Sequence, residues 1–245
     1  EEAIGGQTSA VVAQRGSMRI VRTRGGLTIA AAGVDGSNVE PDRVLLLPVD
    51  PDASAARLAA GLGARAGGTV GVIVSDTAGR PWRLGQTDHA IGASGVRVLL
   101  PYAGRVDPYG NELAVTTIAL ADELAAAAEL VKGKLAGRPV AVIRGLAELV
   151  GPQSAAIGAR ALVRSGRDDL FSHGSREAVL AALCRALEVP EAYQELVGLE
   201  PATAAARLLA RGVLPADPAE LVRRLLEEAS GLGEPTGGDL GTAQA

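Results

Sequence analysis

The chain has 245 residues, 47% of them hydrophobic and only 2% aromatic, and a formal net charge of −4. This length can bury one core of Ala, Val, Leu and Ile, with room for a small appendage. The mixed charge argues against nucleic acid as a partner, and no uninterrupted apolar run of about 18 residues is available to cross a membrane. With Cys184 as the single cysteine and no signal-like start, we expect a soluble, cytoplasmic protein.

Short apolar runs separated by turn residues predict strands in the first hundred residues. These strands cover residues 19–23, 27–32, 43–48, 69–75 and 96–100. The run at 43–48 is continuous, as in a buried strand, and the Asp-Pro-Asp sequence at 50–52 predicts a helix over 52–63. The first part of the chain is therefore expected to be mostly β, with one helix.

The middle of the chain is mixed, and its last third is helical. Residues 105–111 predict a polar loop, 113–119 fit either a strand or a helix, 122–132 predict a helix that ends at Gly133, and 139–143 predict a strand. After about residue 151, helical spacing with start and stop signals covers 175–187, 190–197, 201–211 and 217–230. The Gly/Thr/Gln-rich end, 234–245, is expected to be disordered.

These elements predict the α+β fold class, with mixed sheets and packed helices followed by a small all-helical C-terminal appendage. We expect a core over residues 1–165, the helical appendage over 166–232 and a disordered tail over 233–245.

Two aspartates follow predicted strands in turn-like sequences. Asp35 lies in GVDGSN, after a strand, and Asp76 lies in SDT, where the strand at 69–75 ends. Two such strand ends can bring two carboxylates together, and Thr77 adds a hydroxyl. Oxygen ligands of this kind suit Mg²⁺ or Mn²⁺. The alternative is that each aspartate is only a turn residue or a helix cap.

An arginine-rich segment follows directly after the SDT sequence. Arg80 and Arg83 flank Pro81-Trp82 and offer forked donors for phosphate or carboxylate. The alternative is a solvated loop with Trp82 packed in the core. Asp88, a little farther on, can bind a metal, orient Arg83 or cap a helix that starts there.

The only two lysines among the 24 basic residues stand in one turn, as Lys132-Gly133-Lys134. Their pairing suggests an anion-binding role, and the alternative is two solvated cations at a helix C-terminus. Neither a GxxxxGK[ST] loop nor a GxGxxG motif is present. Because the chain has two histidines and one cysteine, zinc and Ser-His-Asp or Cys-His chemistry are poorly supplied, which leaves metal-assisted phosphoryl chemistry.

Taken together, these motifs resemble the coenzyme F420-0:gamma-glutamyl ligase family, including the ligase half of the actinobacterial two-domain enzymes. The resemblance runs from about residue 11 to about residue 171. It is carried by GVDGSNV (33–39), LLPVDPDASA (46–55), VSDTAGRPWRLGQTDHAIG (74–92), ADELAAAAELVKGK (121–134) and PVAVIRG (139–145).

The resemblance implies a gamma-glutamyl ligase-like fold and a GTP-dependent amide ligase that adds L-glutamate to coenzyme F420-0 through an acyl phosphate. It places divalent-metal ligands at Asp35, Asp76 and Thr77, with two Mg²⁺ or Mn²⁺ sites and a monovalent cation as a further option. Asn38 falls on a GTP contact, and Lys132, Gly133 and Lys134 fall near a nucleotide segment. It also implies a homodimer formed through the sheets. We assign Arg80, Arg83 and Asp88 to catalysis as our own hypothesis.

Members of the family usually carry about 70 further residues before the position of Glu1, including GTP-binding segments. We therefore expect the ligase core to be shortened at its N-terminus. His89 stands where a small apolar residue is expected, and the C-terminal helices show no flavin-binding signature. Two alternatives follow: a truncated homologue that binds without turnover, and a metal-dependent phosphohydrolase that uses water in place of the amine.

Overall fold

The computed structural model describes residues 2–151, 157–164, 169 and 171–230. The described chain separates into two compact units, which we call the hairpin unit (residues 25–163) and the helical unit (residues 1–24 together with residues from 164 onward). Small sheets with packed helices and a helical C-terminal region confirm the α+β prediction. The predicted tail at 233–245 lies outside the described residues.

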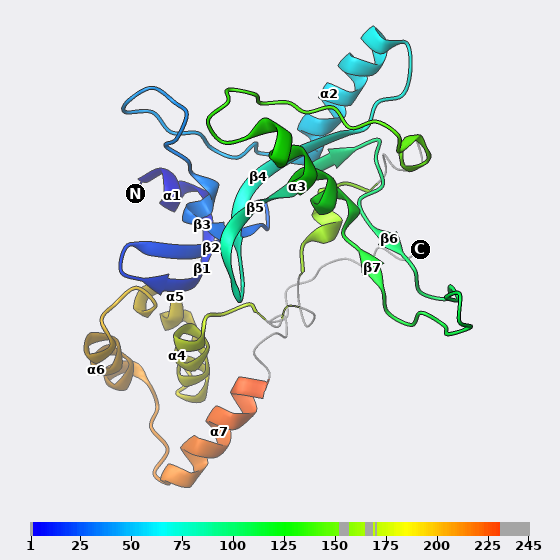
Figure 1. Ribbon diagram of the computed structural model, residues 1–245. Coiled ribbons are helices and arrows are strands. Elements are labelled where there is room, and N and C mark those ends of the chain that lie inside the picture. The colour runs from blue at the N-terminus through cyan, green and yellow to red at the C-terminus, as the bar shows by residue number, and fades with distance from the viewer. Residues whose placement is uncertain (1, 152–156, 165–168, 170, 231–245) are drawn as a thin grey trace. The chain divides into compact units, whose positions relative to one another are not determined.

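The hairpin unit is built around one long antiparallel hairpin (Figure 1). Its strands are β3 (Thr28–Ala30), β4 (Val72–Arg80), β5 (Arg83–Ser94), β6 (Leu100–Pro101) and β7 (Thr117–Ile118). Its helices are α2 (Pro51–Ala66) and α3 (Leu120–Lys132), with short 3-10 turns at Ala31–Gly33, Ala147–Leu149 and Ala159–Leu162. β4 pairs with β5, and β6 with β7.

Helix α2 begins where the sequence predicts it. The Asp50 side chain accepts a hydrogen bond from the Ala53 amide at 2.8 Å, and Pro51 occupies the first turn, where no amide hydrogen is needed. Gly67 ends the helix in a left-handed conformation with φ of 67°. The helix is three residues longer at its C-terminus than the predicted range.

Asp52 fastens the start of α2 to the rest of the hairpin unit. Its Oδ1 atom accepts hydrogen bonds from the amides of Ala93 and Ala159, each at 2.8 Å. Gly92 lies so close to Pro51 that a Cβ atom there would overlap the Pro51 carbonyl. The buried core beside this contact consists of small and branched side chains: Ala90, Ala93, Val96, Val98, Ala121 and Ala159.

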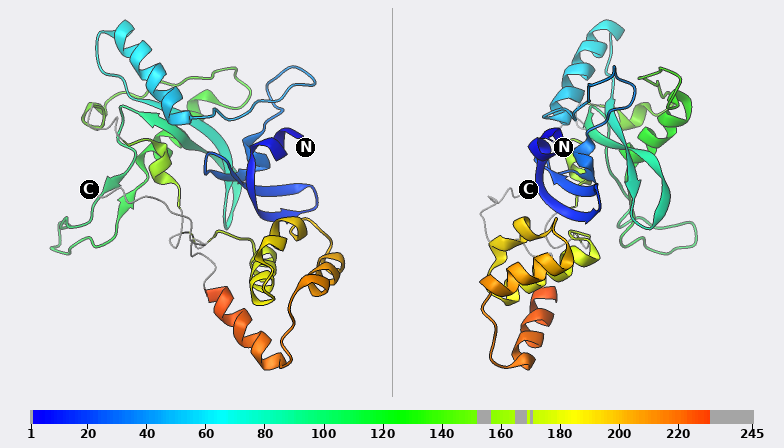
Figure 2. Two further views of the ribbon diagram at one scale, coloured as in Figure 1. Left: turned by 180° about the vertical axis from the view of Figure 1, so that it is seen from behind. Right: turned by 90° about the vertical axis from the view of Figure 1, so that its left-hand side faces the viewer.

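The helical unit consists of α-helices and an N-terminal hairpin. It contains α1 (Glu2–Gln7), β1 (Thr8–Arg15), β2 (Met18–Thr23), α4 (Ser175–Ala186), a 3-10 turn at Pro190–Ala192, α5 (Tyr193–Leu196), α6 (Pro201–Arg211) and α7 (Pro218–Ser230). Figure 2 shows α4 to α7 in yellow to red. The four helical ranges predicted from the sequence are all found, within a few residues.

The N-terminal hairpin and α4 are joined by several contacts within this unit. The Gly174 amide donates to the Val12 carbonyl at 2.8 Å, and the Gln14 amide donates to the buried Glu177 carboxylate at 3.0 Å. Leu187, Leu196 and Cys184 lie in its core. In the described part of the chain, no helix has the length and apolarity needed to span a bilayer.

Three strand predictions are wrong. The run at 43–48 forms only a single bridge, between Leu45 and Asp35, and Val44 and Leu46 are about half exposed. The run at 139–143 is in no strand. At 96–100, Val96 makes one bridge to Val150, and the paired strand β6 starts only at Leu100. An apolar run has strand propensity, but it becomes a strand only where a sheet edge is free to pair with it.

The strand at 69–75 also does not end at Ser75. β4 begins at Val72 and continues through Asp76 and Thr77 to Arg80, because β5 pairs with it along its whole length. Asp88 therefore lies in the middle of β5 and does not start a helix. Trp82, in the turn between the strands, is 86% exposed and is not packed in the core.

Candidate active site

The β4–β5 hairpin presents polar side chains on both of its faces. Asp76 is paired with His89, and Thr77 with Asp88. Because consecutive side chains of a strand point to opposite faces, the Asp76 carboxylate and the Thr77 hydroxyl leave the hairpin on opposite sides. The SDT sequence therefore provides two separate groups and not one adjacent pair of ligands.

On the Thr77 face, Asp88 is the acceptor for three donors. The Thr77 hydroxyl donates to Oδ1 at 2.8 Å, and the Ser75 hydroxyl donates to Oδ2 at 2.8 Å. The Lys132 ammonium, at the end of α3, lies 2.7 Å from Oδ2, and it is also 3.4 Å from Glu129. The Asp88 side chain is only 3% exposed and that of Lys132 is 15% exposed. This network fastens the C-terminus of α3 to the hairpin.

The protonation of this network follows from its contacts. Burial alone would raise the pKa of Asp88, but the hydrogen bonds from Lys132, Thr77 and Ser75 outweigh it, and the pKa lies below its usual value. Burial likewise opposes the charge of Lys132, yet its bonds to Asp88 and Glu129 raise its pKa. Both groups are therefore charged at neutral pH. Two of the roles predicted for Asp88 required either a contact with Arg83 or a position at the start of a helix, and the structure shows neither.

The second lysine of the turn meets the first predicted aspartate. The Lys134 ammonium lies 3.6 Å from Oδ2 of Asp35, and both side chains are about half exposed. Nearby, the Asn38 side-chain amide donates to the Lys134 carbonyl at 3.4 Å. The loop at 33–39 and the turn at 132–134, about 96 residues apart, thus lie together.

Asp35 and Asp76 lie within electrostatic range of each other. Burial is the main reason why the pKa of Asp76 is raised, and the negative charges of Asp35 and Asp88 raise it further, against a hydrogen bond from the Thr77 backbone and the positive charge of Lys134. The pKa of Asp35 is lowered, chiefly by hydrogen bonds from the Ser37 hydroxyl and amide at 2.6 and 2.7 Å. Two carboxylates and one ammonium therefore share this side of the site.

Residues 2–145 match the family described as F420-0:gamma-glutamyl ligase, which is more than half of the chain. The chain belongs to this family. The predicted resemblance is thereby confirmed, and the gathered residues come from the segments that carry it: the loop at 33–39, the β4–β5 hairpin and the end of α3.

Three archaeal proteins named coenzyme F420:L-glutamate ligase are similar to the chain. The one from Methanopyrus kandleri is 48% identical over 157 residues, which are 62% of this chain and 61% of that protein. The one from Archaeoglobus fulgidus is 45% identical over 52% of this chain and 51% of that protein, and the one from Methanothermobacter thermautotrophicus is 41% identical over 59% and 58%. The chain thus spans between about half and three fifths of the relatives' length.

The two arginines that we assigned to catalysis lie at the tip of the hairpin. Arg80 and Arg83 are paired across the turn, four and five residues from Asp76 and Asp88 along their strands. At about 3.3 Å per residue this separation is about 13 to 17 Å along the strands. The Arg80 guanidinium donates to the Leu84 carbonyl at 3.4 Å, and Arg83 is exposed. The hairpin does not bring them to the carboxylates.

Gly133 and Ser75 show what the sequence could and could not reveal. The Gly133 amide donates to the Glu129 carbonyl at 2.9 Å, and its φ of 62° with ψ of 148° is a conformation for which glycine is suited. Its part is therefore to separate the two lysines. Ser75 was missed as a site residue, although the alternation of a strand that continued past it would have placed it beside Thr77.

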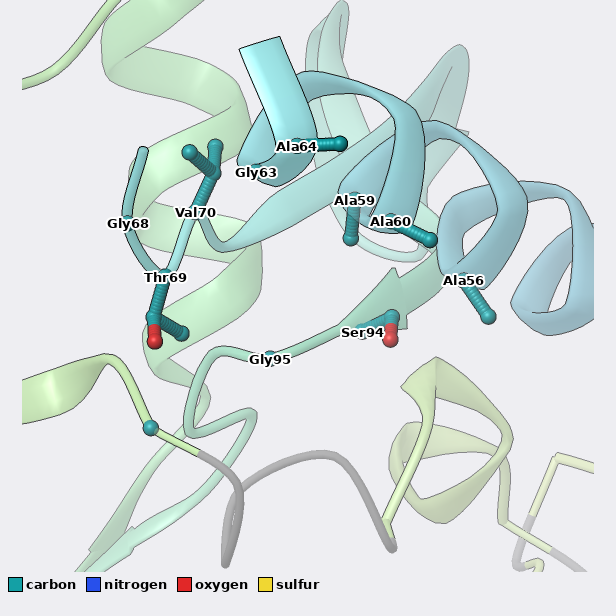
Figure 3. Close-up of a pocket in the computed structure, with 11 residues that line it drawn as sticks. Ala56, Ala59, Ala60, Gly63, Ala64, Gly68, Thr69, Val70, Ser94 and Gly95 are labelled. Atoms are coloured by element: carbon teal, nitrogen blue, oxygen red, sulfur yellow. The ribbon is translucent and has the colours of Figure 1, made fainter. Parts of the chain in front are cut away.

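The described part of the hairpin unit contains a small cavity and a more open hollow. A cavity of about 130 Å³ borders Asp76 and is lined by 27–29, Ala78, Gly79, His89 and Ile91. The other, shown in Figure 3, is a hollow of about 280 Å³ between α2 and the starts of β4 and the segment after β5, lined by small residues without a charged side chain. The first of these borders Asp76, whereas the second borders no charged residue.

The donor set of the ligase family site suits a hard divalent cation. In the described part of the chain, no three His, Cys, Asp or Glu side chains are grouped closely enough to hold an ion by themselves. Asp35 and Asp76 nevertheless offer two carboxylates. Burial is the main cause of the raised pKa of Asp76 and the negative charge of Asp35 adds to it, so a divalent cation would relieve both effects. The residues therefore fit Mg²⁺ or Mn²⁺, with further oxygen ligands from a bound phosphate or water.

Proposed function

We propose that this chain forms an amide bond between L-glutamate and coenzyme F420-0, with GTP as the phosphoryl donor. Membership of the gamma-glutamyl ligase family and the names of the relatives support the glutamate and coenzyme substrates. The proximity of Asp35, Asp76 and Lys134, contributed by three separate segments, is the observation that carries the proposal to the residues of this chain.

The reaction proceeds in two steps. An oxygen of the acceptor carboxylate attacks the γ-phosphorus of GTP, the bond from that phosphorus to the β,γ-bridging oxygen breaks, and GDP leaves. The glutamate amine then attacks the acyl carbon, phosphate leaves with the bonding electrons, and the amine nitrogen loses a proton. Activation is needed because a free carboxylate is a poor electrophile and has no good leaving group.

The chain's own residues handle three anionic partners. Asp35 and Asp76 would hold divalent cations, with Thr77 serving from the opposite face of the hairpin in a second site. When bound, such cations neutralise the phosphate charge that repels the attacking carboxylate. Asn38 and Lys134 would contact the nucleotide. Arg80 and Arg83, at the tip, would hold the phosphodiester of the acceptor or the carboxylates of glutamate.

The test is turnover of GTP, Mn²⁺, L-glutamate and coenzyme F420-0, read by the mass of the product. We expect the product to carry added glutamate with this chain, and the rate to fall at least about 100-fold with Asp76→Asn, because the cation site loses one of its carboxylates. Glu112→Gln is the control, since it removes an exposed carboxylate from the loop between β6 and β7.

Each alternative has its own outcome in this assay. Phosphate release that does not need glutamate identifies a phosphohydrolase. Mn²⁺ binding without any turnover identifies a homologue that has lost catalysis. Replacing potassium by sodium in the same assay tests for a monovalent cation, and light scattering tests the proposed homodimer.

A further inference from the structure

The two lysines of the Lys132-Gly133-Lys134 turn are held in different ways. Lys132 is mostly buried and contacts Ser75, Asp88 and Glu129, at 3.3, 2.7 and 3.4 Å. Lys134 contacts Asp35 at 3.6 Å, with 57% of its side chain exposed. Removing the Lys132 ammonium would leave Asp88 as a buried, unpaired charge. Removing that of Lys134 breaks only an exposed ion pair, which is worth little.

The Lys134 ammonium lies beside one of the two carboxylates that would hold a divalent cation. It is 3.6 Å from Oδ2 of Asp35, and its positive charge is a minor contribution that lowers the pKa of Asp76. A divalent cation at these carboxylates would repel an ammonium so close to it, because like charges at such a separation interact strongly when they are partly desolvated. The lysine and the cation therefore compete for the same carboxylates.

The backbone of Lys134 stays in place while its side chain can move. The Asn38 side chain binds the Lys134 carbonyl, and the buried Lys132 network holds the turn from the other side of Gly133. The lysine side chain has four rotatable carbon–carbon bonds, so its ammonium can swing several ångströms about this anchored backbone. The proposed reaction brings new anions to the site, among them the phosphates of the nucleotide.

We propose that Lys134 is an exchangeable counter-ion: its ammonium pairs with Asp35 before a divalent cation binds, and it passes to the terminal phosphates of the nucleoside triphosphate when the cation arrives. This inference rests on the proposed function. It gives the two lysines separate parts, with Lys132 positioning the turn and Lys134 binding substrate. It also links the two ligands, because nucleotide binding removes the ammonium that competes with the cation, and by reciprocity the cation favours the nucleotide.

The experiment measures Mn²⁺ binding to the full chain by electron paramagnetic resonance of the free ion, first without nucleotide. We expect Lys134→Met to bind Mn²⁺ about three- to tenfold more tightly than wild type, since a competing positive charge is lost. With Mn²⁺ bound, the same variant should bind GTP about tenfold more weakly, measured by calorimetry. If Lys134 had only a structural role, its substitution would weaken the binding of both Mn²⁺ and GTP or change neither affinity.

Two further variants separate this effect from others. Lys134→Arg keeps the charge and should retain Mn²⁺ affinity close to that of wild type. Arg138→Gln removes a cation that contacts the Val131 carbonyl at 3.4 Å, and it should change neither affinity. Circular dichroism of each variant confirms that it is folded, and Lys134 is exposed enough for a substitution to be tolerated.

The outcomes distinguish the two proposals. If wild type binds no Mn²⁺, the metal site of the proposed function is wrong, and this inference is wrong with it. If wild type binds Mn²⁺ but Lys134→Met binds it equally or less tightly, the exchange is wrong and the proposed function stands. Tighter Mn²⁺ binding together with unchanged GTP affinity overturns the transfer of the lysine to the phosphates.

Discussion

Asp88 shows how one buried carboxylate can hold together residues from a strand and a helix. It accepts from Thr77, Ser75 and Lys132, so its position determines where the Thr77 hydroxyl points and where α3 ends. The hydrogen of the Thr77 hydroxyl is used in this bond, which leaves the lone pairs of its oxygen for another partner. We therefore propose that Asp88 serves the site by positioning Thr77 and the lysine turn.

Asp88→Asn should destabilise the chain by about 3 kcal/mol, because the ammonium of Lys132 then stays buried without its carboxylate. Chemical denaturation measures the free energy of unfolding. Glu129→Gln is the matched control, since Glu129 contacts the same ammonium from a more exposed position, and its loss should cost less than about 1 kcal/mol. Equal losses in the two variants would contradict a special role for Asp88.

Among the elements, the start of α2 lies so close to β5 that a side chain larger than that of glycine at the contact would overlap the helix. Gly92 lies against Pro51, and Asp52 in the first turn of α2 binds the Ala93 amide next to it. The start of α2 is therefore fastened directly to the strand that carries Asp88.

Gly92→Ala should cost about 1–3 kcal/mol, because the added methyl group pushes α2 away from β5. Gly79→Ala is the control: it changes a glycine of the same hairpin beside which a Cβ would meet nothing within 4 Å. We expect it to be neutral or slightly stabilising in the same denaturation experiment. If Gly92→Ala is also neutral, the close approach is not a constraint on the fold.

The helical unit contains a histidine, His173, whose pKa is lowered in the folded chain. Burial, and then the positive charges of Arg185 and Arg22, lower the pKa of His173, although Asp169 and Glu177 act in the opposite direction. Its ring meets that of Tyr193 edge to face, with centroids 5.6 Å apart. The structure therefore favours the neutral imidazole.

Because the pKa of His173 is lower in the folded state than its ordinary value of 6.5, the unfolded chain binds a proton first as pH falls. The stability of the helical unit should be constant above about pH 7 and should decrease as pH falls from 6.5 through the lower folded pKa. His173→Gln should remove this part of the pH dependence, measured as the unfolding temperature from pH 8 to 5. A slope that is unchanged in the variant would assign the effect to another group.

At the scale of the whole molecule, the chain consists of two units with separate cores. The candidate site residues all belong to the hairpin unit, whereas the core around Leu187 and Leu196 belongs to the helical unit. A ligand stabilises the folded unit to which it binds. A cation bound in the hairpin unit should therefore raise the stability of that unit and leave the stability of the helical unit unchanged.

Calorimetry of the full chain should show two unfolding transitions, of which Mn²⁺ shifts only one. At 100 times the dissociation constant the expected stabilisation is about 2.7 kcal/mol. Leu196→Ala should reduce the free energy of unfolding of the helical unit by about 2–5 kcal/mol, because Leu196 is fully buried there. The other transition should then occur at a lower temperature, and the Mn²⁺ affinity should be unchanged. One transition that shifts as a whole would show that the units unfold together.

The sequence by itself was enough to predict the family, the α+β class, the helices of the last third and the start of α2. These features depend on local signals, such as caps, helical spacing and specific motifs, which act between residues close together in the chain. Asp35, Asp76 and the two lysines were likewise predicted as candidates from their surroundings.

Only the tertiary structure decided how these residues are arranged. It continued β4 through Asp76 and Thr77 and so turned their side chains to opposite faces, and it left the apolar run at 43–48 with a single bridge. It also paired Lys132 with Asp88 and Lys134 with Asp35, across 44 residues in the first case. Such pairings depend on which strand edge or charge becomes a neighbour in space, and no local pattern in the chain carries that information.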